Sequence, residues 1–330
     1  MVMNNTIAKE FRREVWRERP YYSLDAYCKN TFGYKLHKVA IDAGFTCPNR
    51  DGTLDTRGCI FCSAGGSGDF AVSIPDFSDS FNGLILPLTT DKIHTGKPDK
   101  IAYFQAFTNT YAPVDRLEHL YREALNNPNV AGISIATRPD CLPPDVMNLL
   151  EKLHQEFFLS PGNEFKKFIW IELGLQTIHK RTANYIRRGY ELSVFDNAVK
   201  VLHAIGIPVI THVILGLPGE SKADCIKTIH YLNQVNIFGI KLQLLHVLKK
   251  TDLYEDYAAG KFNVLTKEGY IDLLVECIGN LSPNIVIHRL TGDGPKDLLA
   301  APEWSRNKRD VLNTFHHEMK ARNIFQGQLI

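Results

Sequence analysis

The sequence predicts an α/β protein whose core is a full or partial (β/α) barrel, and three observations lead to this expectation. Short apolar runs rich in β-branched residues alternate with longer amphipathic stretches from about Lys38 onward, which implies right-handed crossovers and a parallel sheet. The chain has no GxGxxG turn, which argues against a dinucleotide-binding fold. Polar or glycine-rich residues recur where the expected strands end, and that rim carries the chemistry of parallel barrels.

Seven strands and five intervening helices are expected. The strands are predicted at residues 38–42, 101–107, 130–136, 168–175, 208–215, 238–245 and 284–288. The helices are predicted at residues 114–126, 144–157, 193–205, 220–235 and 267–281. The pattern predicts a barrel core over residues 37–289, with an N-terminal extension (1–36) and a C-terminal extension (290–330) that packs on the barrel.

The composition excludes several classes of protein. The chain has 330 residues, of which 44% are hydrophobic and 22% charged, so wholesale disorder is excluded. Lys and Arg number 38 against 36 Asp and Glu, and a net charge of +2 gives no strong overall attraction to nucleic acid. No apolar run reaches the roughly 18 residues of a membrane span, and the N-terminus lacks a secretory signal. We therefore expect a cytoplasmic protein with reduced thiols and no membrane partner.

Three of the seven cysteines are clustered in the loop after the first predicted strand. Eleven residues separate Cys47 from Cys59, and two more separate Cys59 from Cys62. An iron–sulfur cluster held by three thiolates leaves one iron free for another ligand. A structural zinc site normally needs four ligands, and no fourth Cys or His lies nearby in the sequence. The spacing favours an iron–sulfur cluster but leaves zinc and the absence of a metal open. The scattered cysteines are expected to be small buried hydrophobes: Cys28, Cys141, Cys225 and Cys277.

Further polar residues are expected at the same rim. Those singled out at or near the strand ends are Gln105, Gln176, His212 and Gly216. Glu172 lies inside a predicted strand and is expected to face the barrel interior. Both a structural ion pair with Lys241 and a ligand role are open for this carboxylate.

The cysteine loop resembles the cluster loop of the radical S-adenosylmethionine (radical SAM) enzymes. It reads CPNRDG at 47–52 and GCIFC at 58–62; familiar members have three residues between the first two cysteines, and this sequence has eleven. The long spacer is similar to the branch that includes the catalytic subunit of Elongator. Within that branch the chain most resembles the small bacterial YhcC-like family. Five more segments carry the resemblance in order: YFQ at 103–105, TRPD at 137–140, GLQT at 174–177, GLPGE at 216–220 and HRLTGD at 288–293.

This resemblance implies a cofactor set and a reaction. Cys47, Cys59 and Cys62 would ligate three irons of a [4Fe–4S] cluster, and the fourth iron would bind S-adenosylmethionine. One electron, from a donor such as flavodoxin or ferredoxin, would release a 5′-deoxyadenosyl radical that abstracts hydrogen from the substrate. For Arg188 a solvated cation at a helix end is the other interpretation. The residues expected to contact S-adenosylmethionine are Gln105, Glu172, Gln176, Arg188, His212 and Gly216.

The Elongator-like relatives modify the C5 side chain of the wobble uridine in tRNA, so the resemblance implies tRNA as the partner. The specific reaction expected is conversion of carboxymethylaminomethyl-uridine to aminomethyl-uridine. Cations with interleaved aromatics suit RNA. Such segments include Arg12, Arg13, Trp16, Arg17, Arg19, Tyr21, Tyr22 and Tyr27 near one end and Arg306, Lys308 and Arg309 near the other. Alternatives are a radical enzyme acting on a small metabolite or cofactor precursor, and a non-catalytic iron–sulfur binding protein.

Overall fold

The computed structural model describes residues 14–66, 68–73, 97–160 and 166–330. The chain divides into two compact units. Unit 1 comprises Met1–Lys35, Leu175–Arg188 and Thr211–Ile330, and unit 2 comprises Leu36–Gly174 and Gly189–Ile210. Each unit therefore combines segments that are far apart in the chain. The predicted C-terminal extension (290–330) falls in unit 1, as does the predicted N-terminal extension (1–36) except for Leu36.

The main sheet has the strand order β2-β1-β3-β4-β5-β6-β7-β9, and the α/β class is confirmed. The strands are β1 (His37–Asp42), β2 (Val72–Ser73), β3 (Lys100–Phe104), β4 (Val130–Thr137), β5 (Phe168–Gln176), β6 (Val209–Leu215), β7 (Gly239–Leu244) and β9 (Val286–Arg289). The pairs β1–β2, β1–β3, β3–β4, β4–β5 and β7–β9 are all parallel, as the alternating pattern predicts. Strands β8 (Val247–Leu248) and β10 (Leu299–Ala301) form a short antiparallel pair.

All seven predicted strands are present, and six of them end within two residues of the predicted bounds. The exception is the second strand, which was expected over 101–107, whereas β3 ends at Phe104. The amide of Gln105 still donates to the carbonyl of Ile41 (3.1 Å), but Phe107 has a φ of 58°. A left-handed residue cannot continue a strand, so the chain turns at this point.

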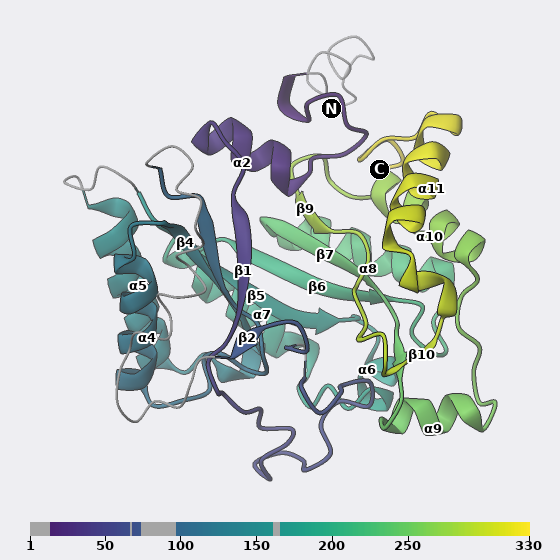
Figure 1. Cartoon of the computed structure of the whole chain (residues 1–330), viewed down its shortest axis with the longest axis horizontal. Coiled ribbons are helices and arrows are strands. Elements are labelled where there is room, and N and C mark those ends of the chain that lie inside the picture. The colour runs from purple at the N-terminus through teal and green to yellow at the C-terminus, as the bar shows by residue number, and fades with distance from the viewer. Residues whose placement is uncertain (1–13, 67, 74–96, 161–165) are drawn as a thin grey trace. The chain divides into compact units, whose positions relative to one another are not determined.

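The helices of unit 2 follow the apolar period of the sequence. They are α4 (Val114–Asn126), α5 (Pro144–His154) and α7 (Leu192–Ala204), and α4 has the predicted bounds. In α4 the buried stripe includes Leu117, Tyr121 and Ala124, and Tyr121 packs edge-on against Phe104 with ring centroids 5.3 Å apart. Helix α4 also packs against α5 (Figure 1). Helix α5 is shorter than expected because the backbone continues as a π-helix over Gln155–Leu159.

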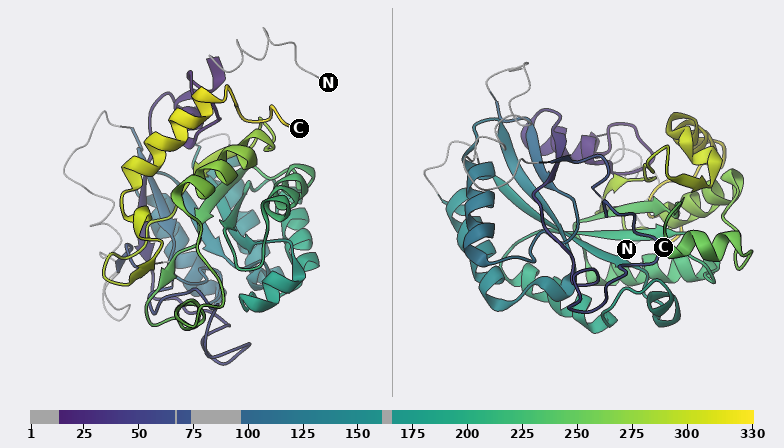
Figure 2. Two further views of the ribbon diagram at one scale, coloured as in Figure 1. Left: turned by 90° about the vertical axis from the view of Figure 1, so that its right-hand side faces the viewer. Right: turned by 60° about the horizontal axis from the view of Figure 1, so that its bottom comes forward.

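Unit 1 contains helices from both ends of the chain. They are α2 (Leu24–Phe32), α6 (Lys180–Tyr185), α8 (Lys222–Val235), α9 (Asp252–Ala258), α10 (Lys267–Gly279) and α11 (Lys308–Ala321). Helices α10 and α11 lie side by side (Figure 2). Gln326, beyond α11, accepts from the amide of Tyr22 (2.8 Å) and donates to the carbonyl of Ile285 (2.8 Å). The two chain ends are therefore tied to each other and to the segment that leads into β9.

The four scattered cysteines are buried, as predicted for small apolar side chains: Cys28, Cys141, Cys225 and Cys277. Across the part of the chain that the structure describes, none of the helices combines the length and apolar character that crossing a membrane would require.

A polar network occupies the interior of unit 2 and links four neighbouring strands. Glu172 on β5 is fully buried and accepts from Lys38 on β1 (2.7 Å) and from Ser134 on β4 (2.6 Å). The Lys38 ammonium lies 4.7 Å from the ring centroid of Tyr103 on β3. A buried carboxylate is tolerated only when it is paired and hydrogen-bonded, and this network meets both conditions. The contacts favour a structural role for Glu172.

Glu172→Ala should lower the free energy of unfolding by about 3 kcal/mol, because it leaves the Lys38 ammonium and Ser134 without their interior acceptor. The control is Glu118→Ala, which removes an acceptor of Arg122 and Lys152 at the surface of α4 and α5 and should cost much less. Urea unfolding of both variants measures the difference. Equal losses would contradict the structural role.

Candidate active site

The cysteine loop of unit 2 begins after β1, and hydrogen bonds between its own backbone groups hold it together. The amide of Gly58 donates to the carbonyl of Asn49 (2.6 Å), and that of Leu54 donates to Pro48 (2.8 Å). The amide of Cys62 donates to the carbonyl of Cys59 (3.0 Å), which forms a tight turn between the two cysteines. Residues 50–57 therefore form a side loop, and backbone hydrogen bonds join the two ends of this loop.

Arg50 ties this side loop to the second half of the cysteine loop. Its guanidinium donates to the carbonyls of Cys62 (3.1 Å) and Ser63, and it lies over the Phe107 ring at 5.5 Å from the centroid. A Cβ on Gly66 would come within 3.0 Å of the same ring, so the backbone approaches Phe107 closely there. The left-handed turn at the end of β3 thus supports the cysteine loop.

The environment of Cys59 favours a thiolate. Asn49 donates its side-chain amide to the sulfur at 3.5 Å. The Cys62 thiol, which bonds Cys59, is the largest cause that lowers the pKa of Cys59, and the charges of Arg138 and Arg50 act in the same direction. The pKa of Cys62 is raised in turn, because its thiol bonds Cys59 and is partly removed from water. Thiolates are the ligands that iron and zinc take from cysteine, so this donor set fits a metal centre.

Arg138 is a buried cation beside this loop. It forms a bidentate pair with Asp140 (2.9 and 2.7 Å) and lies over the Tyr190 ring at 5.3 Å from the centroid. A Cβ on Gly189 would lie 2.8 Å from Asn49 Oδ1 and 3.2 Å from an Arg138 nitrogen, so both polar groups meet at this glycine. Asn49, Arg50 and Arg138 were not predicted as site residues, although all three lie in the motifs that carried the resemblance.

Within the described residues, no three His, Cys, Asp or Glu side chains are arranged to hold a single metal ion. The assignment of Cys47, Cys59 and Cys62 as ligands therefore stays a prediction. Gln105 is half-buried and directly follows β3. The predicted contact of Gln105 with S-adenosylmethionine stays a prediction.

In unit 1, Gln176 at the end of β5 has an unusual backbone and an unpartnered side chain. Its φ is 67°, a left-handed conformation that is uncommon for a non-glycine residue. Its Oε1 is buried without a hydrogen-bond partner. Because strained residues and orphaned buried acceptors persist mainly where a ligand or a function requires them, Gln176 fits the predicted cofactor contact.

Arg188 holds this strained residue from both sides. One guanidinium nitrogen donates to the carbonyl of Leu175 (3.2 Å) and to that of Thr177 (2.6 Å), the residues that flank Gln176. Arg188 is only 4% exposed, so the interpretation as a solvated helix-end cation is wrong. Its guanidinium supplies hydrogen-bond donors to the two carbonyls that flank Gln176 at the end of β5.

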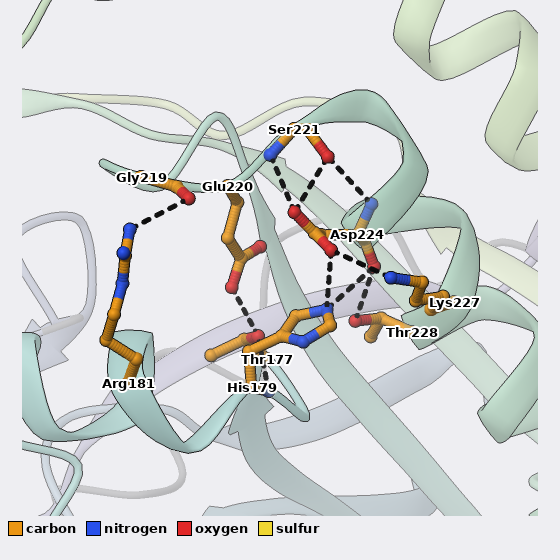
Figure 3. Close-up of polar contacts among 9 residues, drawn as sticks. All are labelled: Thr177, His179, Arg181, Gly219, Glu220, Ser221, Asp224, Lys227 and Thr228. Carbon is orange, nitrogen blue, oxygen red and sulfur yellow. Dashed lines mark hydrogen bonds and ion pairs between the residues drawn. The ribbon is translucent and has the colours of Figure 1, made fainter.

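The turn between β6 and α8 is bonded to the same strand end (Figure 3). Glu220 accepts from the hydroxyl of Thr177 (2.5 Å), and His179 Nε2 bonds the carbonyl of Asp224 (3.0 Å). Burial raises the pKa of Glu220, and the bond from Thr177 opposes this effect. Gly216 has a φ of 86°, and a Cβ there would lie 2.9 Å from Leu265, so packing as well as conformation requires glycine. Adenine contact by this turn stays a prediction.

His212 lies on β6 and is half-buried. Its Nδ1 is 3.5 Å from the side-chain amide nitrogen of Gln243 on β7. The predicted contact of His212 with the cofactor is untested.

The basic and aromatic segments differ from expectation. Tyr21 or Tyr22 is the residue expected to stack on a base. Tyr21 is 4% exposed and its hydroxyl bonds His316 (3.1 Å), so it cannot stack. Tyr22 is half-buried, and stacking by this residue stays a prediction. Trp16 is also buried. Arg306 donates to the carbonyls of Lys296 (3.0 Å) and Leu299 (2.8 Å), and Arg309 is exposed. The predicted contacts by Arg12 and Arg13 lie outside the described residues.

Comparison with known proteins gives two domain matches. The Radical SAM superfamily matches residues 56–232, a range that includes Cys59 and Cys62, and the Radical_SAM C-terminal domain matches residues 237–321. The chain is 41% identical to the uncharacterized protein YtqA of Bacillus subtilis (strain 168), covering 94% of this chain and 93% of that protein. It is 33% identical to protein YhcC of Escherichia coli (strain K12), covering 84% of this chain and 85% of that protein.

Among solved structures, the chain resembles the archaeal Methanocaldococcus infernus Elp3 with an N-terminal deletion (1–46). The TM-score is 0.56 at 17% identity, over 69% of this chain and 55% of that chain. The chain thus spans about half of that structure, and the likeness shows the fold. The predicted barrel of the radical SAM type is confirmed.

Arg188→Ala should lower the free energy of unfolding by about 2–3 kcal/mol, because it removes two charge-assisted bonds from buried carbonyls around Gln176. The matched control is Arg181→Ala on α6, where the exposed guanidinium donates to Gly219 at 3.3 Å and should contribute little. Denaturant unfolding compares the two arginines. An Arg188 variant as stable as the Arg181 variant would contradict the positioning role.

Proposed function

The chain belongs to the radical SAM superfamily and is an Elongator-like member of the YhcC family, and on that premise we propose that it modifies the C5 side chain of a tRNA wobble uridine. It is a radical SAM enzyme, and the superfamily uses a [4Fe–4S] cluster and S-adenosylmethionine. The observation that carries the proposal is the resemblance of most of the chain to the Elongator-like branch. Within this class we propose conversion of carboxymethylaminomethyl-uridine to aminomethyl-uridine.

We assign the cluster to Cys47, Cys59 and Cys62. The support is that all three thiols come from one loop whose base is closed by backbone bonds, and that Asn49 and Arg138 stabilise negative charge at Cys59. When bound, the cluster and S-adenosylmethionine supply a 5′-deoxyadenosyl radical for hydrogen abstraction. The chain's own residues hold these groups and exclude water from the radical.

For S-adenosylmethionine we propose Gln176 as a direct contact, because its Oε1 is a buried acceptor without a partner. Arg188 is proposed as the residue that positions Gln176 through the flanking carbonyls. Gly216 and His212 are proposed beside the adenosine moiety, on the basis of the resemblance. Gln105 completes the proposed set, and the contacts of Glu172 favour its structural role.

For tRNA we propose phosphate contacts at the start of α11, where Arg309 is exposed. An electron donor such as flavodoxin or ferredoxin is the second proposed partner. Both partners imply a cytoplasmic location. The test is a comparison of tRNA nucleosides from cells with and without the protein. Unchanged wobble nucleosides would instead favour the alternatives, a radical enzyme for a small metabolite or a non-catalytic iron–sulfur protein.

Replacing Cys47, Cys59 and Cys62 together by Ala should abolish iron binding and the cluster absorbance after anaerobic reconstitution, because the ligands are lost. Reductive cleavage of S-adenosylmethionine should disappear with it. Cys225→Ala serves as the control, since this cysteine is buried in α8 and should leave both signals intact. Full iron content in the triple variant would refute the ligand assignment.

Arg309→Gln should weaken tRNA binding and reduce the slope of log affinity against log salt by about one unit, as expected for one lost phosphate contact. Lys320→Gln is the matched control, because Lys320 is exposed near the other end of the same helix. Binding is measured by fluorescence anisotropy over a salt series. Identical slopes for both variants would show that the start of α11 does not contact phosphate.

A further inference from the structure

We propose that His246, with Gln243, forms the hydrogen-bonding site for the target base, and that its ligand is the neutral edge of a pyrimidine. The inference rests on the proposed function and adds to it the residues that recognise the substrate. Both side chains belong to unit 1: Gln243 lies near the carboxyl end of β7, and His246 lies in the connection that follows this strand. In parallel α/β folds this edge is where ligands bind.

Gln243 and His246 both lie close to Gly292 in the loop after β9. Gln243 on β7 lies 3.5 Å from His212 Nδ1 on β6, measured from its amide nitrogen. A Cβ on Gly292 would lie 3.2 Å from His246 Cε1 and 3.9 Å from Gln243 Oε1, so both side chains lie near this glycine. A Cβ on Gly294 would lie 3.3 Å from His246 Nδ1. The two glycines allow the loop after β9 to pack closely on the imidazole and fix its place.

His246 carries an unsatisfied polar atom. Its Nε2 is buried and has no hydrogen-bond partner. Leaving a buried polar group unpaired costs about 1–3 kcal/mol, so such a group suggests a ligand that supplies the missing bond. Burial lowers the pKa of His246 to about 4; nearby Asp293 opposes this shift and Lys308 adds to it. The imidazole is therefore neutral at physiological pH.

The chemistry of these groups selects a neutral ligand. A neutral imidazole offers one donor and one acceptor, and the Gln243 amide offers both kinds. A uracil edge presents an N–H donor between two carbonyl acceptors, which complements such groups. Asp293, the carboxylate in the adjoining loop, is already paired with Lys308 at 2.5 Å. A substrate rich in carboxylates would instead require arginine or lysine in the cluster, which favours a base over an anionic cofactor precursor.

The start of α11 adds a site for the nucleic-acid backbone beside this cluster. The Lys308–Asp293 pair ties the helix to the loop that covers His246, and the exposed Arg309 follows directly. A base that leaves its stack to enter an enzyme keeps its phosphates nearby, and cations at that place offset part of the unstacking cost. Base recognition by His246 and phosphate contact by Arg309 are therefore compatible.

The test uses the reconstituted holoenzyme and tRNA whose wobble uridine carries the carboxymethylaminomethyl group. His246→Ala should reduce the rate of tRNA modification at least tenfold, while the tRNA dissociation constant changes less than threefold because phosphate contacts dominate affinity. Gly292→Ala, which crowds the imidazole without removing it, should reduce the rate in the same way. His317→Ala, an exposed histidine on α11, is the matched control and should change neither quantity.

The outcomes separate the inference from the proposed function. If the parent enzyme modifies tRNA and both the His246 and Gly292 variants do so at the parent rate, the base site is refuted and the proposed function stands. If the parent enzyme neither binds nor modifies tRNA, the proposed function fails and the base site fails with it. Selective loss of rate in the two variants, with tRNA binding and urea stability retained, supports the site.

Discussion

The buried carboxylate of Glu172 is the constraint on which the sheet of unit 2 depends. It accepts hydrogen bonds from Lys38 on β1 and Ser134 on β4, and the Lys38 ammonium lies over the Tyr103 ring on β3. An ionised group at this place must keep all its partners, so the register of four strands is fixed together. Because the cysteine loop and the Phe107 turn leave from the ends of β1 and β3, their relative placement follows from this network.

The sequence predicted the elements of the core well and the chain ends poorly. Strand and helix periods are local signals, so α4 has its predicted bounds and seven strands were recognised. The end of β3 was missed because the left-handed Phe107 is held by Arg50 and Gly66, which lie elsewhere in the chain. Helices α2 and α11 were missed because both lie in segments interpreted as extensions. Tyr21 is buried by His316, a partner almost the whole chain away.

The candidate site also combines residues with a local sequence signal and residues whose contacts lie far away in the chain. The three cysteines and Gln176 were predicted from motif and spacing, and their roles stay predictions. The burial of Arg188 was not predicted, because a pair of arginines after a short helix resembles a solvated surface until the tertiary contacts are known. His246 gave no signal at all in the sequence. Its significance comes from an unsatisfied nitrogen and two close glycines, and both are properties of the folded chain.

The backbone hydrogen bond from Gly58 to Asn49 shortens the path between the first two cysteines. Counted through that hydrogen bond, only Pro48, Asn49 and Gly58 separate Cys47 from Cys59, which is the three-residue interval of the familiar radical SAM motif. The extra residues, 50–57, form a side branch whose base is closed by this bond. A sequence search for a fixed number of residues between the cysteines would therefore overlook this chain. The path through the hydrogen bond nevertheless has the familiar three residues.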